Sequence, residues 1–462
     1  MSLPGNSKWI FIVLVLVQVL LVFLNQHNFF FWDTVQFAGK HGTYFFENGL
    51  ENGLLLPDKI DSGHPPLFGY ILSLFWKVFG KTLVVSHWVM VPVLIGILYQ
   101  AFKIGYHYFP KYDWLFPVLL FVCPFYLGHS ILVSPDLLVL FGFLLALRGL
   151  LFKKISLQAI GIIIMSSISL RGAAIGVAVL IYDLHTNPAF SWKRFWVLPW
   201  VELIKKYAVG FVILFVYLVY HYFQKGWLVQ HPDSSWAPSF ASVGVVGMLK
   251  NLLRILWRLM DFGMIAVYVL ILSKLRFLPI LKDRLLWLGL SLFVILAVLT
   301  VPYVGLVNHR YFLPIQIVAL VLGTQLLRAY NKRWLTVGVL IFLFLGNFWI
   351  YPQSISQGWD STFAHQAFYK MENELYQEIQ DLGIDPSDVG TAFPIRSEQK
   401  YISLDENRKS YKQFDLSKDT YILYSNVMNE FNGLSKENVF MKAEVLYSTK
   451  KRGVEMVLYK MN

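Results

Sequence analysis

The sequence predicts a polytopic α-helical membrane protein of about 11 transmembrane helices, with interfacial helices in the first external loop and a small C-terminal soluble α/β domain. Three observations predict this fold class. Of the 462 residues, 56% are hydrophobic and only 15% are charged, a balance that soluble domains of this length do not show. The apolar residues fall in separate runs, many long enough to cross a bilayer core, which takes about 20 residues. After Tyr351 the composition changes to mixed charge.

The predicted spans follow the apolar runs in order. They cover residues 8–25, 83–106, 114–129, 136–152, 155–170, 172–186, 203–224, 262–281, 285–302, 311–328 and 334–350. The segment 155–186 is either one overlong span or two short spans that break at Arg171 and Gly172. Two spans place the Lys and Arg clusters of the short loops on one side, as the positive-inside rule requires. The two-span interpretation therefore predicts a cytoplasmic N-terminus and an extracytoplasmic C-terminal domain.

The net charge of +12 would suggest a nucleic-acid partner in a soluble chain. Most Lys and Arg residues here lie in short loops between apolar runs, where they set the orientation in the membrane. We therefore expect a multi-pass protein of the cell's inner membrane that binds no nucleic acid. The single cysteine, Cys123, excludes an intrachain disulfide and a cysteine metal cluster.

Two external loops are expected to contain short helices that lie on the membrane. In the first external loop, 26–82, the apolar stretch 65–80 is too short for a span and is typical of an interfacial helix. In the loop 225–261, cationic residues recur every four positions opposite Leu and Trp. This amphipathic pattern indicates a second interfacial helix.

The chain divides into a membrane domain, residues 1–351, and an extracytoplasmic domain, residues 352–462. The second part has about a hundred residues, enough for a small soluble fold. It combines a helical pattern with alternating apolar segments. Two alternating arms flank Lys450 to Gly453, which predicts a β-hairpin.

Three polar residues stand out near the external ends of the first spans. Asp33 follows the first span within the aromatic stretch FFFWDT. A partly desolvated carboxylate there suits a general base acting on a hydroxyl. The alternative role for Asp33 is a helix N-cap. His64, in GHPPL, is either a hydrogen-bonded turn residue or a ligand contact. Asp136, in SPDLL, is a helix cap, a cavity-facing charge, or both.

Two arginines are candidates on the same face. Arg171 stands at the hairpin break without an acidic neighbour in sequence, and its planar fork suits a phosphate. Arg310, next to His309, begins a late span; its alternative role is snorkelling at the interface beside Tyr311. Because the orientation came from the Lys and Arg distribution alone, the placement of all these candidates on the external face is a stronger signal than any one of them.

Five motifs occur in a characteristic order. They are WD after the first span, HPPL before a short helix, SPDLLVLFGFLLAL in the fourth span, RG in the helical hairpin and RYFLP at a late span. Over roughly residues 8–350 this order resembles the polyprenol-dependent GT-C glycosyltransferases, in the bacterial branch related to protein O-mannosyltransferases (glycosyltransferase family 39) and to lipid A aminoarabinose and galacturonic acid transferases. The resemblance implies transfer of a sugar from a polyprenyl-phosphate donor, with inversion, to an extracytoplasmic lipid, glycan or protein, and contact with membrane lipid.

The resemblance also implies roles for single residues. Asp33 matches the acidic residue of the first external loop, which serves as base or orients the acceptor; Thr34 stands where relatives often carry a second acidic residue. His64 matches a position where some relatives carry a Lys that touches the donor phosphate. Arg171 and Arg310 match basic residues suited to the donor phosphate. The predicted donor-phosphate or substrate-binding residues are His64, Asp136, Arg171, His309 and Arg310.

Two other functions remain as alternatives. A transporter or lipid flippase for a glycolipid or polyprenyl-linked sugar would also have broken helices and charges within the membrane, but here the charges gather at one face and no inverted repeat is apparent. A non-catalytic assembly protein is the third interpretation. No Walker motif occurs, which disfavours a nucleotide-driven pump. The cofactor is unknown; a divalent cation stays open, because the Asp and His candidates could bind one but show no diagnostic spacing.

Overall fold

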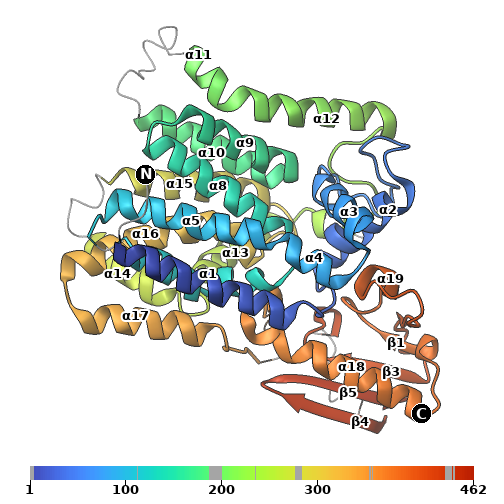
Figure 1. The fold of residues 1–462 in the computed structure, drawn as a ribbon. Helices are drawn as coiled ribbons and strands as arrows, with labels where there is room; N and C mark the ends of the chain where they lie inside the picture. The colour runs from blue at the N-terminus through green and yellow to red at the C-terminus, as the bar shows by residue number, and fades with distance from the viewer. Residues whose placement is uncertain are drawn as a thin grey trace.

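Long helices lie side by side in a bundle, and a small β-sheet lies beside one end of it (Figure 1). The computed structural model describes residues 5–461 except 112, 187–199, 235, 276–282, 353–354, 356, 432–439 and 441–442. Four of the loop cations that favour the predicted orientation lie outside the described residues: Lys193, Arg194, Arg276 and Lys282.

The bundle helices coincide with the predicted spans. They are α1 Gly5–Asn25, α4 Leu83–Val89, α5 Val91–Tyr108, α6 Leu115–Val122, α7 Pro124–Leu127, α8 Pro135–Leu151, α9 Ile155–Ile168, α10 Leu170–Thr186, α11 Trp200–Leu203, α12 Val209–Lys225, α14 Ile265–Leu275, α15 Arg284–Thr300, α16 Leu313–Tyr330 and α17 Arg333–Gly346. In the described part of the chain, 4 helices are long and apolar enough to cross a membrane, or 5 if one bent pair counts as a span. The predicted count of eleven spans is therefore not confirmed.

Two breaks divide helices of the bundle, and only the first was not predicted. α6 ends at Val122 and α7 begins at Pro124, because proline has no N–H to donate to the preceding turn. The break between α9 and α10 falls at Ser169, two residues before the predicted position. The Ser169 hydroxyl accepts a 2.9 Å hydrogen bond from the backbone N–H of Gly172, a helix-capping contact. Arg171 consequently lies in the first turn of α10.

Both predicted amphipathic helices are present. The first loop contains the π-helix η1 Val35–Lys40, α2 His41–Asn48 and the 13-residue α3 Leu67–Phe79. In the later loop, α13 Val245–Met260 is bent by 97° from the helix that follows it. A helix at a right angle to a span suits a position along the membrane surface.

The C-terminal part contains a five-stranded sheet of order β2-β1-β3-β5-β4, with helices α18 Gln366–Asp381 and α19 Gln399–Ile402. The strands are β1 Val389–Thr391, β2 Lys412–Gln413, β3 Tyr421–Ser425, β4 Glu444–Lys451 and β5 Val454–Lys460. β1 pairs in parallel with β2 and β3, whereas β5 is antiparallel to β3 and β4. The pairing of Lys451 with Val454 closes the hairpin that the sequence predicted.

The aromatic run after α1 joins the bundle to the C-terminal part. The Phe30 N–H donates to the Ile402 carbonyl at 2.9 Å, and the Phe31 ring stacks on the His365 ring with centroids 5.0 Å apart. Phe30 and Phe31 are fully buried. Because Asp33 follows directly, this packing fixes the backbone from which its carboxylate projects.

Candidate active site

Asp33 lies in a tight turn between α1 and η1. Trp32, the preceding residue, has a positive φ of 52°, a conformation that bulky residues rarely adopt and that is found more often at functional sites. The Thr34 hydroxyl accepts from the Phe31 N–H at 2.7 Å and closes the turn. The Asp33 carboxylate makes no cap and instead accepts a hydrogen bond from Arg310 Nη2.

The Arg310 guanidinium contacts three carboxylates. Its Nη2 donates to Asp33 and its Nη1 to Asp360, while its Nε lies 3.4 Å from Asp136 Oδ2. Arg310 is only 6% exposed, so these ion pairs lie in a region of low dielectric, where they are strong and cannot be replaced by water. Four segments far apart in the sequence thus meet at one cation.

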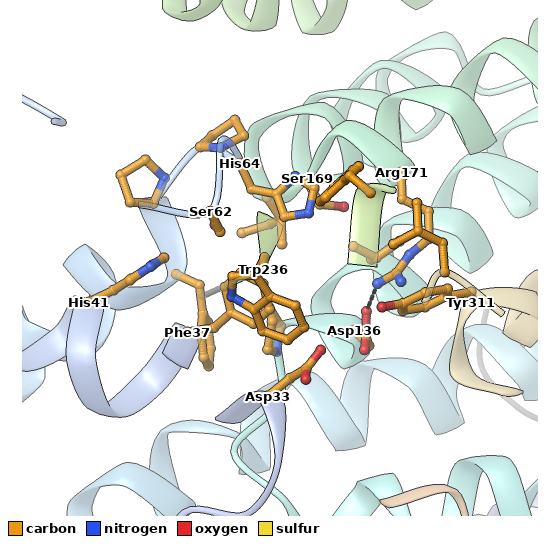
Figure 2. A pocket seen from close by; sticks show the side chains of 18 residues that line it. Asp33, Phe37, His41, Ser62, His64, Asp136, Ser169, Arg171, Trp236 and Tyr311 are labelled. Atoms are coloured by element: carbon orange, nitrogen blue, oxygen red, sulfur yellow. Dashed lines mark hydrogen bonds and ion pairs between the residues drawn. The ribbon is translucent and has the colours of Figure 1, made fainter. Parts of the chain in front are cut away.

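Asp136 also pairs with Arg171. Ser134 accepts from the Asp136 backbone N–H at 3.3 Å and caps α8, which leaves the Asp136 carboxylate to accept a hydrogen bond from Arg171 Nη2. The Arg171 guanidinium lies 4.0 Å from the centre of the Tyr311 ring, a cation–π contact. Figure 2 shows Arg171 held between Asp136 and Tyr311.

The electrostatics of the cluster differ between its carboxylates. Burial raises the pKa of Asp33 to about 6, against the opposing effect of Arg310, and the charges of Asp360 and Asp136 raise it further. For Asp360, burial also acts to raise the pKa, but Arg310 and three neighbouring histidines together outweigh burial, and the pKa is lowered. Asp33 is therefore the carboxylate poised near neutral pH, where a general base works best.

A cavity of about 60 Å³ opens beside this cluster. Asp33, Asp136 and Arg171 line it together with residues of two loops, Ser62, His64 and Trp236 (Figure 2). Among the described residues, the buried Ser62 Oγ, His64 Nδ1 and Trp236 Nε1 atoms have no hydrogen-bond partner. Buried polar atoms are normally paired, so three unpaired ones beside an arginine indicate a binding site for a polar or anionic group.

The charge of His64 differs from that of the lysine that some members of the resembling family carry at the matching position. Burial lowers its pKa to about 4, and the nearby Arg171 adds to the effect. The imidazole is therefore neutral at pH 7 and can donate or accept a hydrogen bond but supplies no positive charge. Among the described residues that line this cavity, which we call the first cavity, Arg171 is the cation.

The structure separates the six predicted residues into three groups. Asp33, Asp136 and Arg171 line the first cavity with His64, as expected for one site. Arg310 forms ion pairs with Asp33 and Asp360 and does not line that cavity. His309 faces away from it, with its Nε2 2.7 Å from Asp261 Oδ2 and its ring stacked on Phe125.

Sequence reasoning missed three residues of the site. Asp360 lies in the C-terminal part and Trp236 in a long polar loop, where composition gives no warning. Tyr311 was considered only as an interfacial neighbour of Arg310. One signal was present in the sequence: the dipeptide Trp-Asp occurs both at Trp32-Asp33 and at Trp359-Asp360.

Among the described residues, no group of three His, Cys, Asp or Glu side chains is arranged to hold a metal ion. The three carboxylates of the cluster are instead paired with the Arg310 guanidinium.

The arrangement of the whole chain matches a known membrane fold. The chain superimposes on ArnT from Cupriavidus metallidurans bound to undecaprenyl phosphate with a TM-score of 0.53 at 11% identity, covering 98% of each chain. For the apo state of that protein the TM-score is 0.51 at 12% identity, with the same coverage. The fold is similar to that of ArnT. No protein-family model and no curated protein sequence matches this chain.

The likeness to ArnT extends over the bundle and the C-terminal part together, since almost the whole of both chains is covered. It establishes the multi-pass membrane fold that the sequence predicted. At this level of identity it says nothing of single residues, so the roles of Asp33, Arg171 and their neighbours rest on the geometry described above.

Proposed function

We propose that this protein is an integral membrane glycosyltransferase that moves a sugar from a polyprenyl-phosphate donor to an extracytoplasmic acceptor with inversion. The observation that carries the proposal is the first cavity, where a carboxylate poised near neutral pH, Asp33, lies with the cation Arg171. The fold supports it, because the similar ArnT structure contains undecaprenyl phosphate. In this chain the polyprenyl tail would lie in the membrane, and the phosphate and sugar at the cavity.

The residues divide the chemistry between them. The acceptor hydroxyl oxygen attacks the anomeric carbon and its proton passes to Asp33, while the bond from that carbon to the phosphate oxygen breaks. The phosphate leaves with the electron pair, and Arg171 stabilises its growing negative charge. Ser62, His64 and Trp236 have polar atoms free to bind the same group or the sugar. Arg310 touches no substrate in this scheme and acts as a positioning residue for Asp33.

The experiment is to purify the full chain in detergent and measure release of polyprenyl phosphate from a panel of polyprenyl-phosphate sugars, with and without candidate acceptors. We expect acceptor-dependent release from at least one donor, reduced at least about a hundredfold in Arg171→Ala. Donor binding without release from any sugar would contradict the proposal and favour the transporter or flippase interpretation.

A further inference from the structure

A second cavity, of about 50 Å³, is lined by Asp360, one of the carboxylates that Arg310 binds. Asp33, which binds Arg310 Nη2, lines the first cavity, whereas Asp360, which binds Nη1, lines the second. The residues that line the two cavities do not overlap. Arg310 thus binds one carboxylate of each cavity, and only the first cavity has a role in the proposed transfer.

The second cavity also has buried polar atoms without partners. Trp32 Nε1, Asn308 Oδ1 and His309 Nδ1 lack a hydrogen bond within the described part of the chain, and all three residues line this cavity. His309 is only 1% exposed, so water in bulk does not satisfy it. Gly358, with φ of 65°, keeps the approach open, because a Cβ there would lie 2.5 Å from His309 Nδ1.

The donors and acceptors at this cavity define the ligand. His309 Nε2 lies 2.7 Å from Asp261 Oδ2 and 3.2 Å from Arg258 Nη1. The closer carboxylate, which Arg258 Nη1 also contacts at 3.3 Å, places the proton of the neutral ring on Nε2 and leaves Nδ1 as an acceptor. Trp32 Nε1 is a donor only. A phosphate group, which only accepts, would meet His309 Nδ1 and the Asp360 carboxylate unfavourably. Arg258 also lines the cavity, but its charge is paired with Asp261 at 3.3 Å. Sugar hydroxyls both donate and accept, so they can bind the unpaired donor and acceptor atoms together.

We propose that the second cavity binds a hydroxyl-rich carbohydrate through Trp32, Asn308 and His309, and that this sugar is the acceptor moiety of the transfer. Its assignment as the acceptor rests on the proposed function; its binding as a sugar does not. Trp32 is the chain neighbour of Asp33, and Asp360 binds the same guanidinium as Asp33, so two residues of the second cavity connect it to the proposed base. A hydroxyl of this acceptor must extend to the first cavity, because Asp33 lines that cavity and the donor's anomeric carbon is attacked there.

The test measures sugar binding separately from catalysis. Saturation-transfer NMR on the full chain in detergent would use a panel of neutral, amino and uronic methyl glycosides. We expect at least one to bind the wild type, with a Kd about three- to tenfold higher in Asn308→Ala and in Trp32→Phe, as for the loss of one hydrogen bond. Asn407→Ala, at an exposed asparagine, should bind like the wild type.

Two results would overturn the inference: no glycoside binds the wild type, or Asn308→Ala and Trp32→Phe bind as well as Asn407→Ala. Thermal unfolding in detergent checks that each variant is folded, and Asn308→Ala suffices if Trp32→Phe does not fold. Glycoside binding as expected, without polyprenyl phosphate release from any donor, would refute the proposed function but leave the sugar site standing. Release without glycoside binding would refute the sugar site alone.

Discussion

Asp33 and Asp360 bind the two terminal nitrogens of a single guanidinium, that of Arg310. Arg310 is 277 positions from Asp33 and 50 from Asp360 in the sequence. The C-terminal part of the chain thereby reaches into the candidate site, and its carboxylate is one cause of the raised pKa of Asp33. The C-terminal part therefore tunes the proposed base as well as packing against the bundle.

Replacing Asp360 should shift the pH dependence of transfer. Burial is the main cause of the raised pKa of Asp33, and Asp360→Asn removes one of the two negative charges that raise it further, so Asp33 should stay ionised to lower pH. We expect the acidic limb of the rate profile to move to lower pH, measured as polyprenyl phosphate release against pH. Asp388→Asn, at an exposed aspartate in the same part of the chain, is the matched control. An acidic limb at the same pH in both variants would contradict the coupling.

The wild-type enzyme should lose activity when Asp33 is protonated. With a folded-state pKa of about 6, the rate should rise between about pH 5 and pH 7.

The stability of the fold should change with pH in the opposite direction. A carboxyl with a raised pKa contributes its full stability below the pKa of the unfolded chain, 3.8, and this contribution is lost as the pH rises through about 6. Asp33→Asn should therefore lose less thermal stability than the wild type between pH 5 and pH 7. A larger loss would contradict the raised pKa.

The Arg171–Asp136 pair should show strong coupling. Arg171→Ala leaves the buried Asp136 carboxylate without one of its cations, and breaking such a pair costs about 3–5 kcal/mol, at the lower end here because Arg310 remains 3.4 Å away. Adding Asp136→Asn should restore part of that loss. Thermal unfolding of the two single variants and the double variant measures the coupling. Additive effects would show that the pair is not an energetic unit.

Gly39 tests the contact between the first loop and the C-terminal part. A Cβ at Gly39 would lie 2.0 Å from the Tyr401 carbonyl oxygen, so Gly39→Ala should lower the unfolding temperature. Gly338, in α17, has nothing within 4 Å of its Cβ position. Gly338→Ala should stabilise its helix by about 0.5–1 kcal/mol. Equal effects of the two substitutions would contradict the close approach.

The sequence predicts local elements of this fold well. Apolar runs locate every described bundle helix, and alternation around Lys450 locates the β4–β5 hairpin, because these patterns record burial directly. Helix ends are harder. The cap at Ser169 depends on a single hydrogen bond, and the break at Cys123 depends on Pro124. Each sets where a helix ends without changing the hydropathy of the segment. The break between α9 and α10 was predicted, so it does not change the count. The predicted spans outnumber the long helices because α6 ends early and because α8, α15 and α17 have 17, 17 and 14 residues, fewer than the roughly 20 that cross a bilayer core.

The candidate site is predictable only in part. Asp33, Asp136 and Arg171 are visible because a charge at the end of an apolar run needs a reason. Asp360 and Trp236 lie in polar sequence, where such residues are common, and their position at the site is a product of tertiary packing. The partners of Arg310 could not be read from the sequence either, since its carboxylates come from segments between 50 and 277 residues away.

The central claim is that Asp33 is the base of a sugar transfer. The most direct measurement is the rate of polyprenyl phosphate release by Asp33→Asn and by the wild type, with the donor and acceptor that the wild type uses. We predict that the folded variant is slower by about 10²- to 10⁴-fold, the usual contribution of a general base. Release by Asp33→Asn at the wild-type rate would contradict the claim.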